Sequence, residues 1–330
     1  MNIILVTGAT GFVGCQLIKQ LSTNSRYTLI AAVRRNIADL SHGVKSQLVG
    51  DLLPTTDWQA ALVGVDVLVH LAARVHMMVD LSADPLAEFR KVNTAGTLNL
   101  ARQAVAAGVK RFIFISSIGV NGNYNSRPFV ESDIANPQEP YAVSKWEAEQ
   151  GLMAIAEETG VEGEGRPEDG DRGKGMEVVI IRPPLVYGAN APGNFGRLTK
   201  WVKRGVPLPL GAVHNKRSFV ALDNLVSFII HCIDHPKAAN EVFLISDGED
   251  VSTTELLRKI ARAFGKRSFL LPVPVGLMTF AAGLLGKRDV ADRLFGSLQV
   301  DSSKARDLLG WRPVVSMDEG LVASRKGAKI

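Results

Sequence analysis

Three glycines spaced three residues apart follow directly on an apolar run at the start of the chain. Ile3 to Val6 has the β-prone apolar composition of a strand buried on both faces. Gly8 permits a tight turn out of this strand, Gly11 lets an anion approach the backbone at the start of a helix, and Gly14 lets that helix lie close to the strand. This order of strand, turn and helix predicts a dinucleotide-binding loop, around which the rest of the chain must fold.

Apolar runs and helix-periodic stretches alternate through the first 180 residues. After a helix from Cys15 to Leu21, the expected strands are Thr28 to Val33, Gln47 to Val49, Val65 to Leu71, Lys110 to Ser116 and Val178 to Ile181, and the expected helices are Pro85 to Ala107 and Tyr141 to Glu157. Such alternation predicts an α/β fold, a Rossmann doubly wound parallel sheet with ligands bound at the carboxyl ends of its strands.

The last third of the chain changes character and predicts a second, smaller α/β domain. We expect residues 1–182 to bind the dinucleotide and residues 183–330 to bind mainly the substrate, with residues 215–247 returning to the first domain. Residues 161–175 are rich in glycine and charge, which predicts a flexible insertion. Val275 to Leu285 is apolar but too short to cross a bilayer, so we expect a packed helix there, with contact to a membrane surface as the alternative.

Composition excludes several classes of protein. The net charge of +5 suits an anionic ligand, and no basic run supports nucleic-acid binding. Two cysteines, Cys15 and Cys232, make no disulfide framework or metal motif, and we expect both to be buried. The apolar N-terminus has no basic segment before it, so a signal peptide is not expected. We expect a cytoplasmic protein with no metal and no transmembrane segment.

A second motif carries chemistry. Tyr141 and Lys145 lie four residues apart in an expected helix, so both face the same way. A lysine beside a tyrosine phenol lowers its pKa toward neutrality, and Ser117, at the end of an expected strand, can hold the same substrate oxygen. The three residues therefore predict a proton relay for an alcohol/ketone pair, with hydride exchanged by a nicotinamide.

Ten stretches along the chain form a recognisable set. They are TGATGFVG, GDL at Gly50 to Leu52, HLAA at His70 to Ala73, VNTAGTLNL at Val92 to Leu100, FISSIGVNG at Phe114 to Gly122, YAVSK at Tyr141 to Lys145, IIRPPLVYG at Ile180 to Gly188, GNF at Gly193 to Phe195, RSFV at Arg217 to Val220 and SKARDLLGW at Ser303 to Trp311. Over nearly its whole length the chain thus resembles extended short-chain dehydrogenase/reductases of the NAD-dependent epimerase/dehydratase family, which act on nucleotide sugars.

The resemblance implies roles for the matching residues. The implied dinucleotide-binding residues are Gly8, Thr10, Gly11, Phe12, Val13, Arg34, Asp51, Leu52, Leu71, Ala72, Ala73, Asn93, Ser116, Tyr141, Lys145 and Pro183. The implied contacts to the diphosphate of a UDP-sugar substrate are Asn194, Arg217 and Arg293, and the bidentate geometry of arginine with phosphate supports Arg217 independently. Relatives pair through two long helices, which implies a homodimer through Pro85 to Ala107 and Tyr141 to Glu157.

Departures from the family pattern narrow the reaction. Dehydratases of this family carry an Asp-Glu pair after the catalytic hydroxyl residue, whereas Ser117 is followed by Ile118-Gly119, which argues against a 4,6-dehydratase. The second strand ends in Arg34 rather than in an acid, which favours NADP over NAD.

Three functions remain open at this point. The first is an NAD(P)-dependent 4-ketoreductase of a UDP-4-keto-6-deoxy-N-acetylhexosamine in surface-polysaccharide synthesis. The alternative is a UDP-hexose 4-epimerase acting on UDP-glucose or UDP-N-acetylglucosamine, and a minor alternative is a non-catalytic dinucleotide sensor. The sequence leaves open which sugar, which C4 stereochemistry and which dinucleotide are used.

Overall fold

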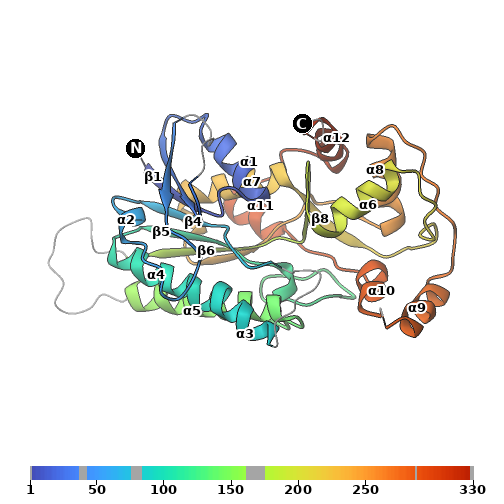
Figure 1. Ribbon diagram of the computed structural model, residues 1–330, viewed down its shortest axis with the longest axis horizontal. Helices are drawn as coiled ribbons and strands as arrows, with labels where there is room; N and C mark the ends of the chain where they lie inside the picture. The colour runs from blue at the N-terminus through green and yellow to red at the C-terminus, as the bar shows by residue number, and fades with distance from the viewer. Residues whose placement is uncertain (1, 37–42, 76–83, 161–174, 287, 328–330) are drawn as a thin grey trace. The chain divides into compact units, whose positions relative to one another are not determined.

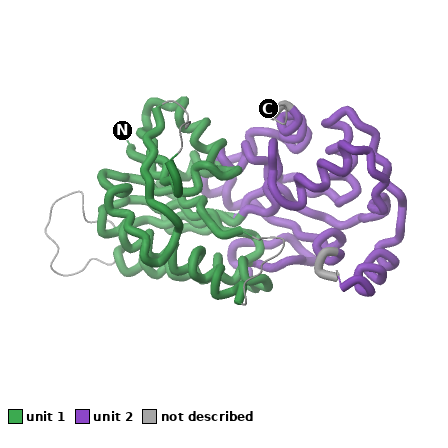
Figure 2. The backbone as a smooth tube through the Cα atoms, viewed as in Figure 1, with its two compact units in different colours: residues 1–120, 135–182, 228–243 green, residues 121–134, 183–227, 244–330 purple. Residues whose placement is uncertain are grey.

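The computed structural model describes residues 2–36, 43–75, 84–160, 175–286 and 288–327 (Figure 1). The chain divides into two compact units (Figure 2). The first comprises residues 1–120, 135–182 and 228–243, and the second comprises residues 121–134, 183–227 and 244–330. The returning segment is therefore shorter than the expected 215–247, and residues 121–134 belong to the second unit rather than the first. The expected insertion, apart from Gly175, lies outside the described residues.

A seven-stranded sheet forms the centre of the first unit, in the order β3-β2-β1-β4-β5-β6-β9. Its strands are β1 (Asn2–Thr7), β2 (Tyr27–Val33), β3 (Val44–Leu48), β4 (Val67–His70), β5 (Arg111–Ile115), β6 (Glu177–Arg182) and β9 (Glu241–Leu244). All five pairings from β3 to β6 are parallel. The order reverses between β1 and β4, which is where ligands bind in such sheets. The predicted Rossmann architecture is confirmed.

Helices cover both faces of this sheet (Figure 1). On one side lie α2 (Gln59–Leu62), α3 (Pro85–Phe89), the π-helical segment η1 (Arg90–Gly96), α4 (Thr97–Ala106) and α5 (Pro140–Gly160), and on the other α1 (Phe12–Leu21). Side chains of α4 and α5, such as Leu100 and Leu152, pack with Phe112 and Ile180 in one fully buried cluster. The helix expected over Pro85 to Ala107 is thus present, with one π-helical stretch inside it.

The first unit also contains two 3₁₀ turns, η2 (Ile118–Val120) and η3 (Pro236–Ala238). The helix α7 (Leu222–Asp234) begins in the second unit and ends in the first. The C-terminal turns of α7 are held by Arg111, whose guanidinium donates to the carbonyl oxygens of Cys232 at 2.7 Å and Ile233 at 2.9 Å.

The second unit contains a small mixed sheet in the order β10-β8-β7. Its strands are β7 (Leu185–Tyr187), β8 (Arg217–Ala221) and β10 (Asp250–Val251), and its helices are α6 (Gly193–Lys203), α8 (Thr253–Ala263), α9 (Val275–Leu284), α10 (Arg288–Phe295), α11 (Ser303–Leu309) and α12 (Met317–Gly327). Ser252 caps α8: its hydroxyl accepts from Glu255 N at 3.1 Å, and Ser252 N donates to the Glu255 carboxylate at 2.7 Å.

Two burial predictions are wrong. None of the residues of α9 is buried, so the expected packed helix is instead an exposed one. Cys15 is exposed, because it lies on the outer side of α1, whereas Cys232 is buried as expected.

Candidate active site

The glycine turn after β1 meets the end of β4 at the point where the strand order reverses. Gly8 has φ +67°, and a Cβ there would lie 2.8 Å from Ala72 N. A Cβ at Gly14 would lie 2.1 Å from the Gly8 carbonyl oxygen. Side chains are therefore excluded by direct collision at both positions. The glycine loop thus contacts the segment after β4, which contains Leu71 and Ala72.

The start of α1 suits a pyrophosphate. The N-cap residue Gly11 provides no side-chain acceptor, and Gly11 N donates to the Gly8 carbonyl at 2.9 Å. The N–H groups of the first turn, at Phe12 and Val13, therefore point out of the helix end, where the dipole favours an anion. Thr10 is exposed beside them. The chain thus fits the dinucleotide that its sequence implied.

A buried histidine, which the sequence analysis did not assign a role, ties the two strand ends together. His70 Nδ1 lies 2.7 Å from Thr7 Oγ1, and Nε2 lies 3.0 Å from Thr97 Oγ1 on α4. Thr7 Oγ1 also accepts from Ala72 N at 3.2 Å. Burial lowers the pKa of His70 to about 3, with a smaller contribution from Lys145. A neutral imidazole therefore bridges the strand ends and α4 at neutral pH.

Asn93, implied to lie near the dinucleotide, clamps the segment after Ala73 to the catalytic helix. Its amide exchanges hydrogen bonds with Arg74, accepting from Arg74 N at 2.8 Å and donating to Arg74 O at 3.0 Å. The same amide nitrogen donates to Ser144 Oγ on α5 at 3.0 Å. Asn93 is buried, with 1% of its surface exposed. Its observed role is thus to fix one wall of the site.

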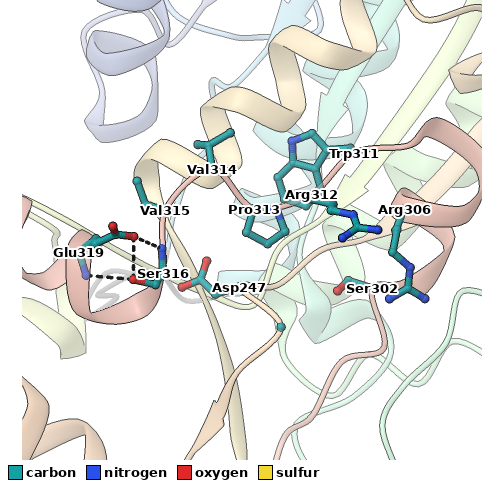
Figure 3. Close-up of a pocket in the computed structure, with 11 residues that line it drawn as sticks. Asp247, Ser302, Arg306, Trp311, Arg312, Pro313, Val314, Val315, Ser316 and Glu319 are labelled. Atoms are coloured by element: carbon teal, nitrogen blue, oxygen red, sulfur yellow. Dashed lines mark hydrogen bonds between the residues drawn. The ribbon is translucent and has the colours of Figure 1, made fainter.

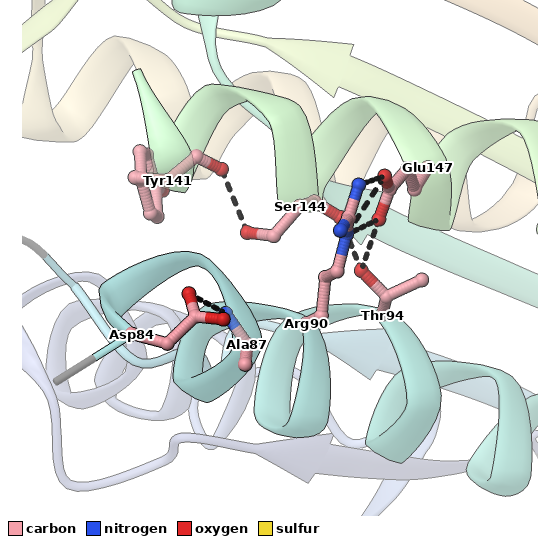
Figure 4. A network of polar contacts seen from close by, with 7 residues as sticks. All are labelled: Asp84, Ala87, Arg90, Thr94, Tyr141, Ser144 and Glu147. Carbon is pink, nitrogen blue, oxygen red and sulfur yellow. Dashed lines mark hydrogen bonds and ion pairs between the residues drawn. The ribbon is translucent and has the colours of Figure 1, made fainter. Parts of the chain in front are cut away.

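A polar network joins η1 and α3 to the start of α5 (Figure 4). Ser144 Oγ donates to Tyr141 O at 2.7 Å, and Thr94 Oγ1 donates to Ser144 O at 2.9 Å. Arg90 Nε lies 3.0 Å from both carboxylate oxygens of Glu147. The aromatic ring of Phe89, on α3, meets that of Tyr141 edge-on at 6.0 Å. These contacts fix the turn of α5 that carries Tyr141.

The expected lowering of the Tyr141 pKa by Lys145 is wrong for the chain as it stands. Burial raises the pKa of Tyr141 to about 12, and burial lowers the pKa of Lys145 to about 7. The Lys145 ammonium lies 4.0 Å from the centre of the Phe114 ring. Because water is excluded from both groups, each disfavours its charged form, and this opposes the phenolate–ammonium pair that the motif predicted.

Two serines follow β5 where the motif requires a hydroxyl. Ser117 Oγ accepts from Gly119 N at 3.1 Å, and a Cβ at Gly119 would lie 3.3 Å from Ala142 Cβ. The turn carrying Ser117 therefore packs on the start of α5, beside Tyr141. Ser116 Oγ is buried and has no hydrogen-bond partner among the residues that the structure describes. Because buried hydroxyls are rarely left unsatisfied, this oxygen is a candidate for contact with a bound molecule.

A buried ion pair lies one turn beyond Lys145, and the sequence analysis missed it. Arg182, at the end of β6, and Glu149 on α5 approach to 2.5 Å between Nη2 and Oε2, with side chains 4% and 2% exposed. Glu149 raises the pKa of Lys145, opposing the larger effect of burial. The spacing of Tyr141, Lys145 and Glu149 at four-residue intervals was the only signal available.

The residues expected around the adenine lie at the ends of β2 and β3. Arg34 Nη1 lies 3.8 Å from Asp51 Oδ1, and these side chains are 78% and 70% exposed. Leu52 is buried against η1, where its Cγ lies 3.0 Å from the position of a Cβ on Gly96. Arg34 and Asp51 are therefore together and open to solvent.

The remaining predicted residues, Pro183, Asn194, Arg217 and Arg293, belong to the second unit. Arg217 Nη1 donates to Arg293 O at 2.7 Å and to Gly296 O at 3.0 Å, so the structure brings Arg217 to the end of α10. Burial lowers the pKa of Arg217, so it is not the solvent-facing charge that an isolated arginine would be. Asn194 is exposed in the first turn of α6, and Pro183 is buried.

A hollow of about 740 Å³ in the second unit is lined by none of the predicted site residues (Figure 3). Its two carboxylates, Asp247 and Glu319, are already hydrogen-bonded within the second unit. Asp247 accepts from Tyr187 Oη and Asn224 Nδ2, both at 2.7 Å, and Glu319 accepts from Ser316 Oγ at 2.7 Å.

Among the described residues, no group of three or more histidine, cysteine, aspartate or glutamate side chains could hold a metal ion. Over the same parts of the chain, no helix has both the length and the apolar character needed to cross a membrane.

Comparison with known proteins gives a consistent result. The model of the NAD dependent epimerase/dehydratase family matches residues 4–246. A UDP-glucose 4-epimerase of Vibrio cholerae is 47% identical over 320 residues, which cover 96% of this chain and 92% of that protein. An N-acetyl-alpha-D-glucosaminyl-diphospho-ditrans,octacis-undecaprenol 4-epimerase of Escherichia coli O157:H7 is 30% identical over 83% of this chain and 77% of that protein. The fold is similar to that of UDP-glucuronic acid 4-epimerase from Bacillus cereus in complex with NAD, with a TM-score of 0.77 and 23% identity over 99% of this chain and 98% of that one.

Proposed function

Because the chain belongs to the NAD-dependent epimerase/dehydratase family, and so is an enzyme that modifies nucleotide sugars with a nicotinamide dinucleotide, we propose that it is a UDP-hexose 4-epimerase. The observation that carries the proposal is the fixed geometry of Ser117, Tyr141 and Lys145 at the carboxyl end of β5 and the start of α5. The similarity to the Vibrio cholerae enzyme supports the epimerase over the 4-ketoreductase that the sequence analysis put first.

The chemistry of such an epimerase divides between the dinucleotide and the chain. A bound nicotinamide ring supplies a hydride acceptor that is regenerated within each turnover. Tyr141 accepts the proton of the C4 hydroxyl when the C4–H bond breaks, and returns it to the oxygen when hydride adds to the opposite face. Ser117 Oγ orients that oxygen, and the Lys145 ammonium offsets part of the cost that burial places on the Tyr141 phenolate. No proton or hydride is gained or lost overall.

Direct measurement of the sugar product tests the proposal. Purified protein with UDP-glucose should form UDP-galactose, seen by proton NMR of the anomeric region, with no net change in the absorbance of reduced cofactor. A matched incubation holds a UDP-4-keto-6-deoxy-N-acetylhexosamine and NADPH. Stoichiometric NADPH oxidation there, with no epimerisation of UDP-glucose or UDP-N-acetylglucosamine, would establish the reductase instead.

The choice of dinucleotide is a separate proposal. We propose that Arg34 can accept the 2′-phosphate of NADP, because its guanidinium lies at the end of β2 and is 78% exposed. Its ion pair with Asp51 must loosen for this to happen. Dissociation constants for NAD and NADP, measured for the wild type and Arg34→Ala, should show a loss confined to NADP. Equal losses for both dinucleotides would contradict the assignment.

A second candidate is supported by the exposed helix α9. The Escherichia coli relative is named for a sugar joined through a diphosphate to a polyprenol, so its substrate carries a lipid tail. An apolar exposed helix suits a chain that takes such a substrate. Epimerisation of a polyprenyl-diphosphate N-acetylhexosamine in detergent, without epimerisation of the UDP-sugars, would favour this candidate.

We propose, finally, that the enzyme is a homodimer paired through the helices α3, α4 and α5, as the family resemblance implies. Light scattering coupled to gel filtration measures the mass directly, and a mass equal to that of one chain would contradict the pairing.

A further inference from the structure

The helix α9 is exposed although it is almost entirely apolar. Leu277, Phe280, Leu284 and Leu285 are 60%, 66%, 75% and 73% exposed. The helix has a single polar side chain, that of Thr279, and its hydroxyl donates to the carbonyl oxygen of Val275 at 3.0 Å. An apolar face of this kind costs free energy in water, so it indicates a surface that is covered in use.

Backbone hydrogen bonds hold the segment that leads into α9. The segment before α9 pairs with the loop after α6: Leu208 N donates to Phe269 O, and Leu271 N donates to Leu208 O, both at 2.8 Å. Phe269 and Leu271 are themselves 54% and 52% exposed. The other end of α9 leads into α10, which packs against it at the edge of the second unit (Figure 1). The apolar patch therefore comprises the segment 269–271, α9 and Leu285.

Basic residues outnumber acidic ones in the sequence around this patch. Residues 256–288 include seven lysines and arginines and no aspartate or glutamate. Lys266 and Arg267 are exposed immediately before the patch, and Lys287 and Arg288 follow it in the sequence. Basic residues flanking apolar side chains match the surface of an anionic lipid bilayer, where the charges meet headgroups and the apolar side chains enter the acyl boundary.

The same charge argues against a second copy of the chain on this patch, because pairing two copies would bring like charges together. Not all seven basic residues contribute equally. Lys259 is paired with Glu249 at 2.9 Å and Asp318 at 3.1 Å, and α10 adds the acidic residues Asp289 and Asp292. The basic pairs nearest to α9 in the sequence remain in excess.

We propose that the apolar patch docks the protein on an anionic membrane surface, with α9 lying in the plane of the interface. The ten residues of α9 extend about 15 Å, half of the hydrocarbon thickness, so the helix can lie on a bilayer but cannot cross it. This inference does not depend on which sugar is the substrate.

Sedimentation with vesicles tests the inference on the full chain. Wild-type protein should pellet with vesicles of phosphatidylglycerol and phosphatidylcholine, much less with pure phosphatidylcholine, and less as salt is raised. The double variant Phe280→Ser with Leu284→Ser should lose at least about tenfold in partition, because two large side chains no longer leave water. A matched control, Val63→Ser with Ile134→Ser, replaces two apolar residues that are at least as exposed, at 75% and 92%, and should bind as wild type.

Each outcome decides the inference. Circular dichroism and thermal melting should show that all variants remain folded, as expected for substitutions of exposed residues. Failure of the wild type to pellet with the anionic vesicles, or equal pelleting of both double variants, would overturn membrane docking. The patch is instead an interface between copies if two results are found together. The wild type fails to pellet, and light scattering gives a lower mass for the Phe280→Ser, Leu284→Ser variant than for the wild type and the control variant.

Discussion

Replacing Glu149 by glutamine tests how the chain supports Lys145, the lysine of the proposed proton relay. Glu149 and Arg182 form a buried, doubly bonded ion pair, with N–O distances of 2.5 Å and 3.0 Å and side chains at most 4% exposed. The variant leaves the Arg182 guanidinium buried without the Glu149 carboxylate, and breaking a pair of this kind costs about 3–5 kcal/mol of folding free energy. Glu149→Leu combined with Arg182→Leu removes both charges and should recover most of this loss.

The same change should alter the pH dependence of turnover. Burial lowers the pKa of Lys145 to about 7, and the negative charge of Glu149 acts in the opposite direction. Without Glu149 the pKa of Lys145 falls further, so the ammonium form, which the proposed mechanism requires, is lost at lower pH. The alkaline limb of the kcat profile should therefore move to lower pH.

The assay combines denaturant unfolding with a pH series of kcat for sugar epimerisation. The matched control is Glu157→Gln on the same helix, an exposed carboxylate that water screens. This control should change both stability and the pH profile little. A Glu149→Gln profile that overlays the wild type would refute the electrostatic role, even if stability falls, because a purely structural ion pair predicts only the stability change.

Three other perturbations follow from the geometry. Tyr141→Phe should lower kcat by about 10²–10⁴-fold, the usual contribution of a positioned acid–base group, with dinucleotide affinity unchanged by calorimetry. Gly14→Ala places a Cβ 2.1 Å from the Gly8 carbonyl oxygen and should weaken dinucleotide binding by about 1–3 kcal/mol of strain, measured by titration. Acidification should destabilise the fold through His70, whose folded-state pKa of about 3 lies below its ordinary 6.5. The unfolded chain then binds a proton that the folded chain excludes, so stability present above pH 6.5 is lost toward pH 3, by about 2 kcal/mol at pH 5.

Controls separate these effects from general damage. Gly276→Ala, at a glycine with ordinary φ and open space around it, should leave dinucleotide binding as it is. Full turnover in Tyr141→Phe would refute the proton relay. The acid destabilisation should be smaller in His70→Gln than in the wild type when each is compared with its own stability at pH 7. If the unfolding free energy falls equally with pH in both proteins, the acid destabilisation comes from groups other than His70.

Local sequence determined the elements and the loop at the centre of the fold. The apolar run Ile3 to Val6 and the glycines after it could be interpreted without tertiary information, because strand burial and a turn with φ above zero each impose a local requirement on residue type. Tyr141 and Lys145 were likewise predicted from helical spacing alone. Helix and strand ends agreed within a few residues for the same reason.

Tertiary structure decided which side chains from distant parts of the sequence come into contact. The bridge from Thr7 through His70 to Thr97 joins three segments, and only folding shows that the imidazole is buried and neutral. The direction of the Tyr141 and Lys145 pKa shifts depends on how much water the surrounding helices exclude, which a motif does not specify. The exposure of α9 also depends on the elements around it. Its sequence determined that it is apolar, but only the packing of its neighbours decided that this surface is left facing solvent, because hydrophobicity drives burial without choosing the partner that covers it.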